Sequence, residues 1–211
     1  MVKTPFEIVY EDKKIIVVYK KPHLLSISTP KEKVRTLYHE VLTYVKARYS
    51  NDHKIFVVHR LDKETSGLIV FAKSFEVKNE LQTLFEEGKV GRYYNAIVSP
   101  IPNKKKATLK EELLIDKIGN VRVVKNKCKF SKTAITKYEI VGTKENKAIL
   151  NIEILTGRKN QIRSALANIG SPILGDKKYG GQDYKRMCLN AYKLDLSSYD
   201  SKYVFEKKIT F

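Results

Sequence analysis

The pattern of apolar and polar positions predicts mainly short β-strands. Residues 6–10 and 15–19 are β-branched and aromatic runs separated by the polar residues 11–14, an arrangement typical of a β-hairpin. Further strands are predicted at 56–58, 68–71, 95–99, 121–124, 134–141 and 148–155. The prediction is therefore a sheet built from many short strands.

Three segments instead show helical spacing of their apolar residues. Helices are predicted over 36–48, over 75–85 with Gly88 at its end, and over 160–169 with Gly170 and Pro172 behind it. Because strands outnumber helices and no linker or repeat interrupts the chain, we expect an α+β fold. We expect one domain over residues 1–211, with a mixed, largely antiparallel β-sheet and flanking helices.

The charge of the chain points to an acidic partner. There are 41 Lys and Arg residues against 23 Asp and Glu, a formal net charge of +18. The three successive thirds (1–70, 71–140 and 141–211) carry +5, +7 and +6 (13 basic against 8 acidic, 15 against 8, and 13 against 7). An even excess indicates an extended basic surface that meets a polyanion rather than a charged tail.

Other features exclude several classes of protein. There is no secretory signal pattern and no apolar run long enough to span a bilayer. Cys128 and Cys188, without neighbouring His, do not resemble a disulfide framework or a zinc site. We expect a cytoplasmic protein with no membrane partner and no metal site.

The segment 59–68 carries the densest candidate chemistry. It places Asp62, two basic groups, Glu64 and a Ser-Gly turn between two predicted strands. Asp62 on such a loop could pair locally with Arg60 or Lys63, or it could be a catalytic carboxylate held between rigid elements. Composition alone favours the local pair, whereas the placement favours catalysis.

Two further segments supply candidate partners. Arg163 is predicted at the start of a helix beside apolar residues, where a partly buried guanidinium needs an acidic partner, either structural or catalytic. Tyr93 and Tyr94 should lie on opposite faces of a strand, so at most one faces a given site. That tyrosine is either a core residue or a platform for stacking a base.

The stretch 117–138 contains seven Lys and Arg residues and no acidic residue. If it forms a hairpin, Lys125, Lys127 and Lys129 share one face. Seven uncompensated cations repel one another unless phosphates approach, so we favour a phosphate-binding surface over a solvated one.

Together these residues resemble the RluA family of ribosomal large subunit pseudouridine synthases. His59–Leu68 is similar to the catalytic motif of that family, and Lys20-Lys21-Pro22 to its first motif. Arg92–Ala96 resembles the tyrosine motif and Thr156–Arg163 the last motif, all in the family's order. The resemblance covers nearly the whole chain.

The resemblance implies a catalytic domain with a central active-site cleft that isomerises uridine to pseudouridine in ribosomal or transfer RNA. Asp62 would be the catalytic aspartate, Tyr94 would stack on the flipped uracil, and Arg163 would keep Asp62 ionised. The motif leaves open whether Asp62 attacks the ribose, attacks the base or acts as a base in an elimination. No cofactor is implied, since the bonds broken and formed are internal to the substrate.

RNA contacts are expected from six cations, with Arg60 filling the gap left by the extruded base. The six are Arg60, Lys21, Arg158, Lys125, Lys127 and Lys129. We expect a monomer, and no S4-like RNA-binding domain before the first motif. RNA is the expected partner.

The sequence departs from the family pattern at Asn160, Ser164-Ala165 and Asn190. These departures leave open a catalytically idle RNA-binding or ribosome assembly factor with the same fold. A metal-dependent nuclease that uses Asp62, Glu64 and Lys63 is a more distant possibility, because no third acidic ligand lies nearby in the sequence.

Overall fold

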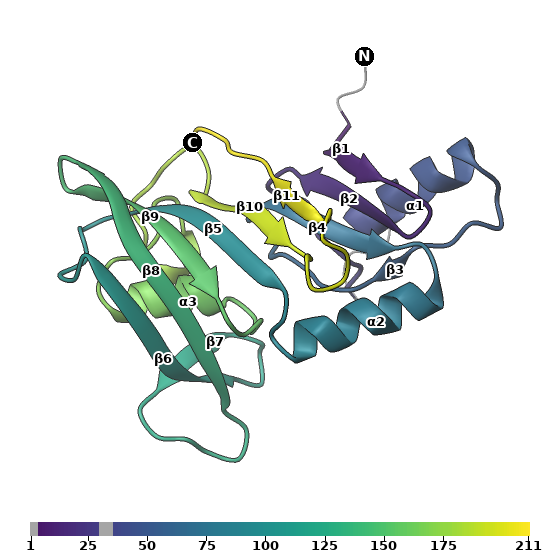
Figure 1. Cartoon of the computed structure of the whole chain (residues 1–211). Coiled ribbons are helices and arrows are strands. Elements are labelled where there is room, and N and C mark those ends of the chain that lie inside the picture. The colour runs from purple at the N-terminus through teal and green to yellow at the C-terminus, as the bar shows by residue number, and fades with distance from the viewer. Residues whose placement is uncertain (1–3, 30–35) are drawn as a thin grey trace. The chain divides into compact units, whose positions relative to one another are not determined.

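The computed structural model describes residues 4–29 and 36–211, which form two compact units. The first unit contains the described residues up to Val90 together with Ala191–Ile209, and the second contains Gly91–Asn190 with Thr210–Phe211. Figure 1 labels the elements of both.

The first unit holds six strands: β1 (Phe6–Glu11), β2 (Ile15–Lys20), β3 (Phe56–Val57), β4 (Ser66–Ala72), β10 (Leu189–Asp195, of which the last five residues belong here) and β11 (Val204–Glu206). Their order is β1-β2-β4-β10, with β3 on β4 and β11 on β10. The β1–β2 hairpin is antiparallel, as predicted. The β2–β4 pairing is also antiparallel and places Lys20 opposite Gly67.

Two predicted helices of this unit are confirmed. They are α1 (Leu37–Arg48) and α2 (Phe75–Glu86). Thr36 and Ser74 cap their first turns, accepting hydrogen bonds from the main-chain N–H groups of His39 and Val77. Gly88 follows α2 with a φ of 70°, a conformation that favours glycine.

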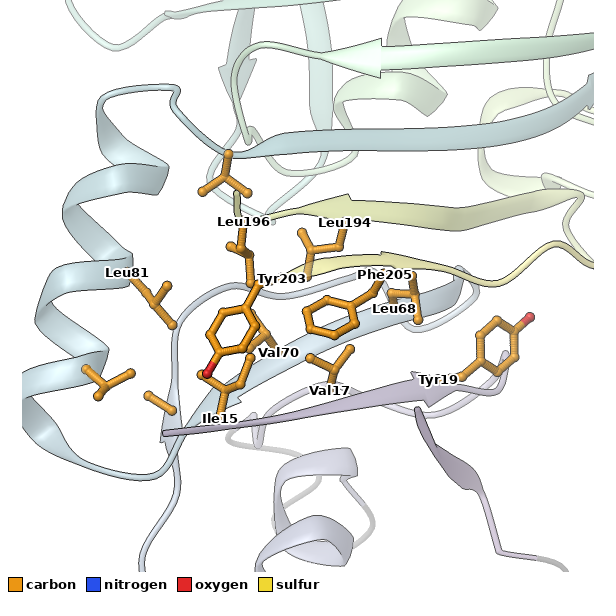
Figure 2. Packing of buried hydrophobic residues seen from close by; sticks show 13 residues of the cluster. Ile15, Val17, Tyr19, Leu68, Val70, Leu81, Leu194, Leu196, Tyr203 and Phe205 are labelled. Carbon is orange, nitrogen blue, oxygen red and sulfur yellow. The ribbon is translucent and has the colours of Figure 1, made fainter. Parts of the chain in front are cut away.

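The core of the first unit surrounds the central strands β2 and β4, in which every residue is buried. Side chains of these strands pack against Leu81 of α2, Leu194 of β10, and Tyr203 and Phe205 at β11 (Figure 2). Burial on both faces explains why Ile15–Tyr19 and Leu68–Phe71 are continuous apolar runs rather than alternating ones.

The second unit holds β5 (Gly91–Val98), β6 (Lys106–Ile115), β7 (Val121–Val124), β8 (Lys132–Lys144) and β9 (Lys147–Ile154) in the order β5-β9-β8-β6-β7. The four ladders that join them are antiparallel. Helix α3 (Gln161–Asn168) and a short 3-10 helix (Lys177–Tyr179) complete the unit. The α+β class with a largely antiparallel sheet is confirmed, whereas the single domain stays a prediction.

The hairpin proposed for the basic stretch is wrong. β7 pairs with β6, and β8 pairs with β6 and β9. Residues 125–131 therefore form the connection between β7 and β8 and not two facing strands. Strand alternation does not set the direction of Lys125, Lys127 and Lys129, which are exposed in this loop.

Candidate active site

Asp62 lies in the connection between β3 and β4, as the sequence predicted. The Asp62 side chain is half-buried, and its neighbour Leu61 is buried. The N–H of Thr65 donates to the main-chain carbonyl oxygen of Asp62 at 3.1 Å, which closes a turn just before β4. The carboxylate is thus carried by a short loop that leads directly into a fully buried strand.

Two side chains, one at the end of β2 and one in the segment after it, contact the main chain of this loop. The Ser26 hydroxyl donates to the carbonyl oxygen of Leu61 at 2.7 Å and accepts from the N–H of Leu61 at 3.1 Å. The ammonium of Lys20, which is fully buried, donates to the carbonyl oxygen of Lys63 at 3.0 Å. Both contacts join residues more than thirty positions apart in the chain.

The Lys20 ammonium also holds its own segment. It donates to the carbonyl oxygens of Lys21 at 3.0 Å and Leu24 at 2.9 Å. Burial lowers the pKa of Lys20 to about 7, and the charges of Glu64 and Asp62 oppose that shift. Glu64 in turn contacts the imidazole Nδ1 of His23 at 2.5 Å.

Gly67, at the start of β4, is required by its surroundings. Its φ is 134°, and a Cβ there would lie 2.4 Å from the carbonyl oxygen of Ala191 in β10. The motif glycine therefore allows the close approach of two main chains directly after the Asp62 loop.

Arg163 has the acidic partner that its predicted burial required. Its Nε donates to Oδ2 of Asp176 and its Nη2 to Oδ1, both at 2.7 Å. The two side chains are 8% and 0% exposed. The partner within the second unit is thus Asp176, and the pairing with Asp62 stays a prediction.

Tyr94 occupies a buried position on β5, and Tyr93 is half-buried on the alternate face, as predicted. Arg92 shares the face of Tyr94 and is buried. Burial lowers the pKa of the Arg92 guanidinium, and the nearby Tyr94 opposes the shift. A Cβ on Gly157 would lie 2.7 Å from Nη1 of Arg92, so this glycine makes room for the guanidinium.

The expected RNA-binding cations lie on different parts of the two units. Arg60 is exposed in the Asp62 loop, and the Lys21 ammonium donates to the Thr4 carbonyl at 2.7 Å. Arg158 is exposed, and its Nε donates to the Thr133 carbonyl at 3.1 Å.

Acidic side chains from neighbouring strands compensate part of the positive charge of the basic stretch 117–138. Lys137 pairs with Glu153 of the neighbouring strand at 3.2 Å. The Glu112 carboxylate of β6 accepts hydrogen bonds from Ser131 at 2.7 Å and Thr133 at 2.5 Å, at the base of the 125–131 loop. The adjacent strands supply acidic groups that the sequence of 117–138 alone does not reveal.

The departures from the family pattern are all at buried positions. Asn160, Ser164, Ala165 and Asn190 are buried. Asn160 precedes α3 with a φ of 51°, and the Ser164 hydroxyl donates to its carbonyl oxygen at 3.0 Å. The predicted helix thus begins one residue later, at Gln161.

Sequence reasoning missed Lys20, Ser26 and Asp176 as parts of these arrangements. A usable signal existed for Lys20, a lysine directly after the apolar run Ile15–Tyr19. Ser26 and Asp176 gave no local signal, because their partners lie elsewhere in the sequence.

Residues 4–29 and 36–211 contain neither a cluster of metal-binding side chains nor a helix that could span a membrane. No three His, Cys, Asp or Glu side chains come together there as a metal site requires. No helix in that part of the chain has the length and apolar character needed to cross a membrane.

Comparison with known proteins gives consistent matches. The family model described as RNA pseudouridylate synthase matches residues 14–168. An uncharacterised RNA pseudouridine synthase of Mycoplasma pneumoniae is 34% identical over 179 residues, covering 83% of this chain and 56% of that protein. One from Haemophilus influenzae is 32% identical over 191 residues, covering 90% and 81%.

A ribosomal large subunit pseudouridine synthase D from Buchnera aphidicola is 31% identical over 184 residues, covering 83% of this chain and 55% of that protein. The chain thus spans little more than half the length of two of these three relatives. Among solved structures, human RNA pseudouridylate synthase domain containing 4 superimposes with a TM-score of 0.80 at 22% identity, covering 96% of this chain and 88% of that one. The chain therefore belongs to the RNA pseudouridine synthase family, of the ribosomal large subunit (RluA) type whose motifs it carries.

Proposed function

We propose that this protein isomerises uridine to pseudouridine in RNA, with Asp62 as the catalytic aspartate. The observation that carries the proposal is the complete His59–Leu68 motif inside the matched range 14–168, with Asp62 on a loop that leads directly into the buried strand β4. In this reaction the bond from C1′ of the ribose to N1 of uracil breaks and a bond from C1′ to C5 forms. The C5 proton leaves and N1 gains one, so no cofactor is consumed.

Tyr94 and Arg163 complete the proposed catalytic group. Tyr94 is proposed to stack on the uracil that has left its RNA helix and to assist proton transfer. Arg163 is the cation proposed to pair with Asp62 as well, and its bidentate pair with Asp176 holds the guanidinium in a defined orientation.

The proposed substrate is ribosomal large subunit RNA, with transfer RNA as the alternative. The names of the related synthases favour the ribosomal substrate. The net charge of +18, spread over the chain, fits a folded polyanion, and Arg60, Lys21 and Arg158 are proposed phosphate or base contacts.

The test is release of tritium from 5-tritiated uridine in a ribosomal large subunit RNA transcript. The wild-type protein should release tritium, and Asp62→Asn should release none while it still folds and binds the transcript. Asp183→Asn, which changes a 90% exposed side chain, serves as the matched control and should be fully active. Near wild-type release by Asp62→Asn would refute the assignment.

The second candidate function is an RNA-binding assembly factor without catalysis. The observation that favours it is the set of buried departures from the family pattern at Asn160, Ser164 and Asn190. It predicts that a gene encoding Asp62→Asn fully complements a deletion strain. Mapping pseudouridine in total RNA from the deletion strain decides between the two functions. Specific uridines stay unmodified in that strain only if the missing protein is the synthase.

A further inference from the structure

We propose that Lys20 and Ser26 are positioning residues that fix the main chain on both sides of Asp62. The inference rests on the proposed function, in which Asp62 reacts with the substrate. Neither residue is proposed to touch RNA. Both act through the peptide groups of the loop that carries the carboxylate.

Four consecutive peptide groups around Asp62 each have a hydrogen bond. The Ser26 hydroxyl accepts from the N–H of Leu61 and donates to the carbonyl oxygen of Leu61, so it holds the peptide groups on both sides of this residue. The carbonyl of Asp62 accepts from the N–H of Thr65, and the carbonyl of Lys63 accepts from Lys20. One side-chain hydroxyl thus holds the loop before Asp62, and one ammonium holds it after the Asp62 turn.

The Lys20–Ser26 segment is itself fixed, so it can serve as a rigid support. Lys20 is the last residue of β2 and pairs with Gly67 of β4. Its ammonium also binds the carbonyl oxygens of Lys21 and Leu24 within the segment. Lys20 thus joins the end of one buried strand, the segment after it, and the loop that enters the neighbouring strand.

The choice of a lysine supports a geometric role. A fully buried ammonium is costly unless it is hydrogen-bonded, and an apolar side chain of similar volume often packs with no loss of stability. Three main-chain acceptors at 2.9–3.0 Å satisfy all three N–H groups of Lys20. The arrangement fixes directions that an apolar side chain could not fix.

Such fixation matters for the rate because a reacting group must be held to within about 0.5 Å of its productive position. A displacement of about 1 Å can lower the rate about 100-fold without changing how tightly the substrate binds. Loss of either side chain should therefore lower the rate constant of the bound complex and leave the dissociation constant for RNA almost unchanged.

The experiment compares Ser26→Ala and Lys20→Met with the wild type by two measurements. The first is amide hydrogen exchange of a peptide that spans residues 58–66, which reports the main chain without reference to chemistry. The second is single-turnover tritium release from a ribosomal large subunit transcript at saturating enzyme. We expect faster exchange and a rate constant about 10- to 100-fold lower, with the dissociation constant for RNA within about 3-fold.

Two control variants separate positioning from general destabilisation. Ser74→Ala removes one capping hydrogen bond from α2 and should lower the melting temperature without changing the exchange of 58–66 or the rate. Ser26→Thr keeps the hydroxyl and should recover most of the rate lost in Ser26→Ala.

Unchanged exchange and an unchanged rate in a folded Ser26→Ala protein would overturn the proposal. The proposal would also be overturned if Ser74→Ala, at the same loss of melting temperature, lowered the rate constant as much as Ser26→Ala does. A wild-type protein that releases no tritium from the transcript would instead refute the proposed function for that RNA, and the exchange measurement would still decide whether Ser26 and Lys20 hold the loop.

Discussion

Arg163 and Asp176 form a buried bidentate ion pair, with Nε to Oδ2 and Nη2 to Oδ1 both at 2.7 Å. The same Asp176 carboxylate accepts from the N–H groups of Lys178 and Tyr179 at the start of the 3-10 helix. One carboxylate thus orients the guanidinium of α3 and the chain that follows Gly175. This contact fixes the orientation of Arg163, the last residue of the Thr156–Arg163 motif.

Replacing Asp176 with Asn should destabilise the protein strongly. Asn keeps the volume but removes the negative charge of Asp176 from the buried bidentate pair with Arg163, and breaking a buried pair in this way typically costs about 3–5 kcal/mol. Urea denaturation followed by circular dichroism gives the free energy of unfolding. Asp183→Asn is the control, because Asp183 pairs with Lys177 at 3.7 Å and both side chains are more than 80% exposed. The control should change stability by less than about 0.5 kcal/mol, and equal effects of the two substitutions would contradict the prediction.

Gly67→Ala should also be destabilising, by about 3 kcal/mol, because an unfavourable φ and a close contact act together. The added Cβ would lie 2.4 Å from the carbonyl oxygen of Ala191. Gly170→Ala isolates the conformational part, since Gly170 has a φ of 77° and a Cβ added there would meet no atom within 4 Å. Its expected cost is about 1 kcal/mol, measured by the same denaturation experiment. If both glycines proved equally replaceable, the contact with β10 would not be a constraint.

The elements that the sequence predicted are those whose signals are local. Apolar runs marked the buried strands β2 and β4, and apolar periodicity marked α1 and α2, with Gly88 marking the end of α2. Strand β6 was missed because only Leu113 of its ten residues is buried, so the run lacks a clear apolar face. Strands β10 and β11 were missed, and a three-residue segment such as Val204–Glu206 is too short to show an apolar pattern and is defined by its pairing with a neighbour.

The residues of the candidate site were likewise predicted where their signals are local and missed where they are not. Asp62, Tyr94 and Arg163 stand in recognisable motifs, and their placement on a loop, a strand and a helix start was predicted. The residues that support them were not, because Ser26 lies 35 positions from Leu61 and Lys20 lies 43 positions from Lys63. Every residue has a main-chain carbonyl oxygen, so the sequence does not show which of them accepts a hydrogen bond, and no motif marks these contacts.

The buried Lys20 predicts a pH dependence of stability. Its pKa in the folded protein is about 7, against 10.5 in the unfolded chain, so between these values the unfolded chain binds a proton that the folded protein does not. The contribution of Lys20 to the free energy of unfolding therefore rises with pH across this window, by up to about 1.4 kcal/mol per pH unit, and is lost as the pH falls toward 7.

This dependence is measured as the difference in free energy of unfolding between the wild type and Lys20→Met at pH 6, 7, 8 and 9. Shared contributions of other groups cancel in the difference. The difference should stay flat below about pH 7 and shift in favour of the wild type above it. A difference that is constant across all four values would mean that Lys20 stays protonated in the folded protein.

Neutralising the loop between β7 and β8 should weaken the salt dependence of RNA binding. Lys125, Lys127 and Lys129 are exposed, and the turn that carries Lys129 is closed by the Ser131 N–H donating to the Cys128 carbonyl at 3.0 Å. If each lysine contacts a phosphate, replacing all three with Gln lowers the slope of log K against log salt concentration by about 2. The control replaces Lys13, Lys14 and Lys54, three exposed lysines of the first unit, with Gln. Both variants lose three positive charges. A salt slope that changes only in the loop variant identifies local phosphate contacts. An equal change of slope in both variants would assign the effect to net charge alone.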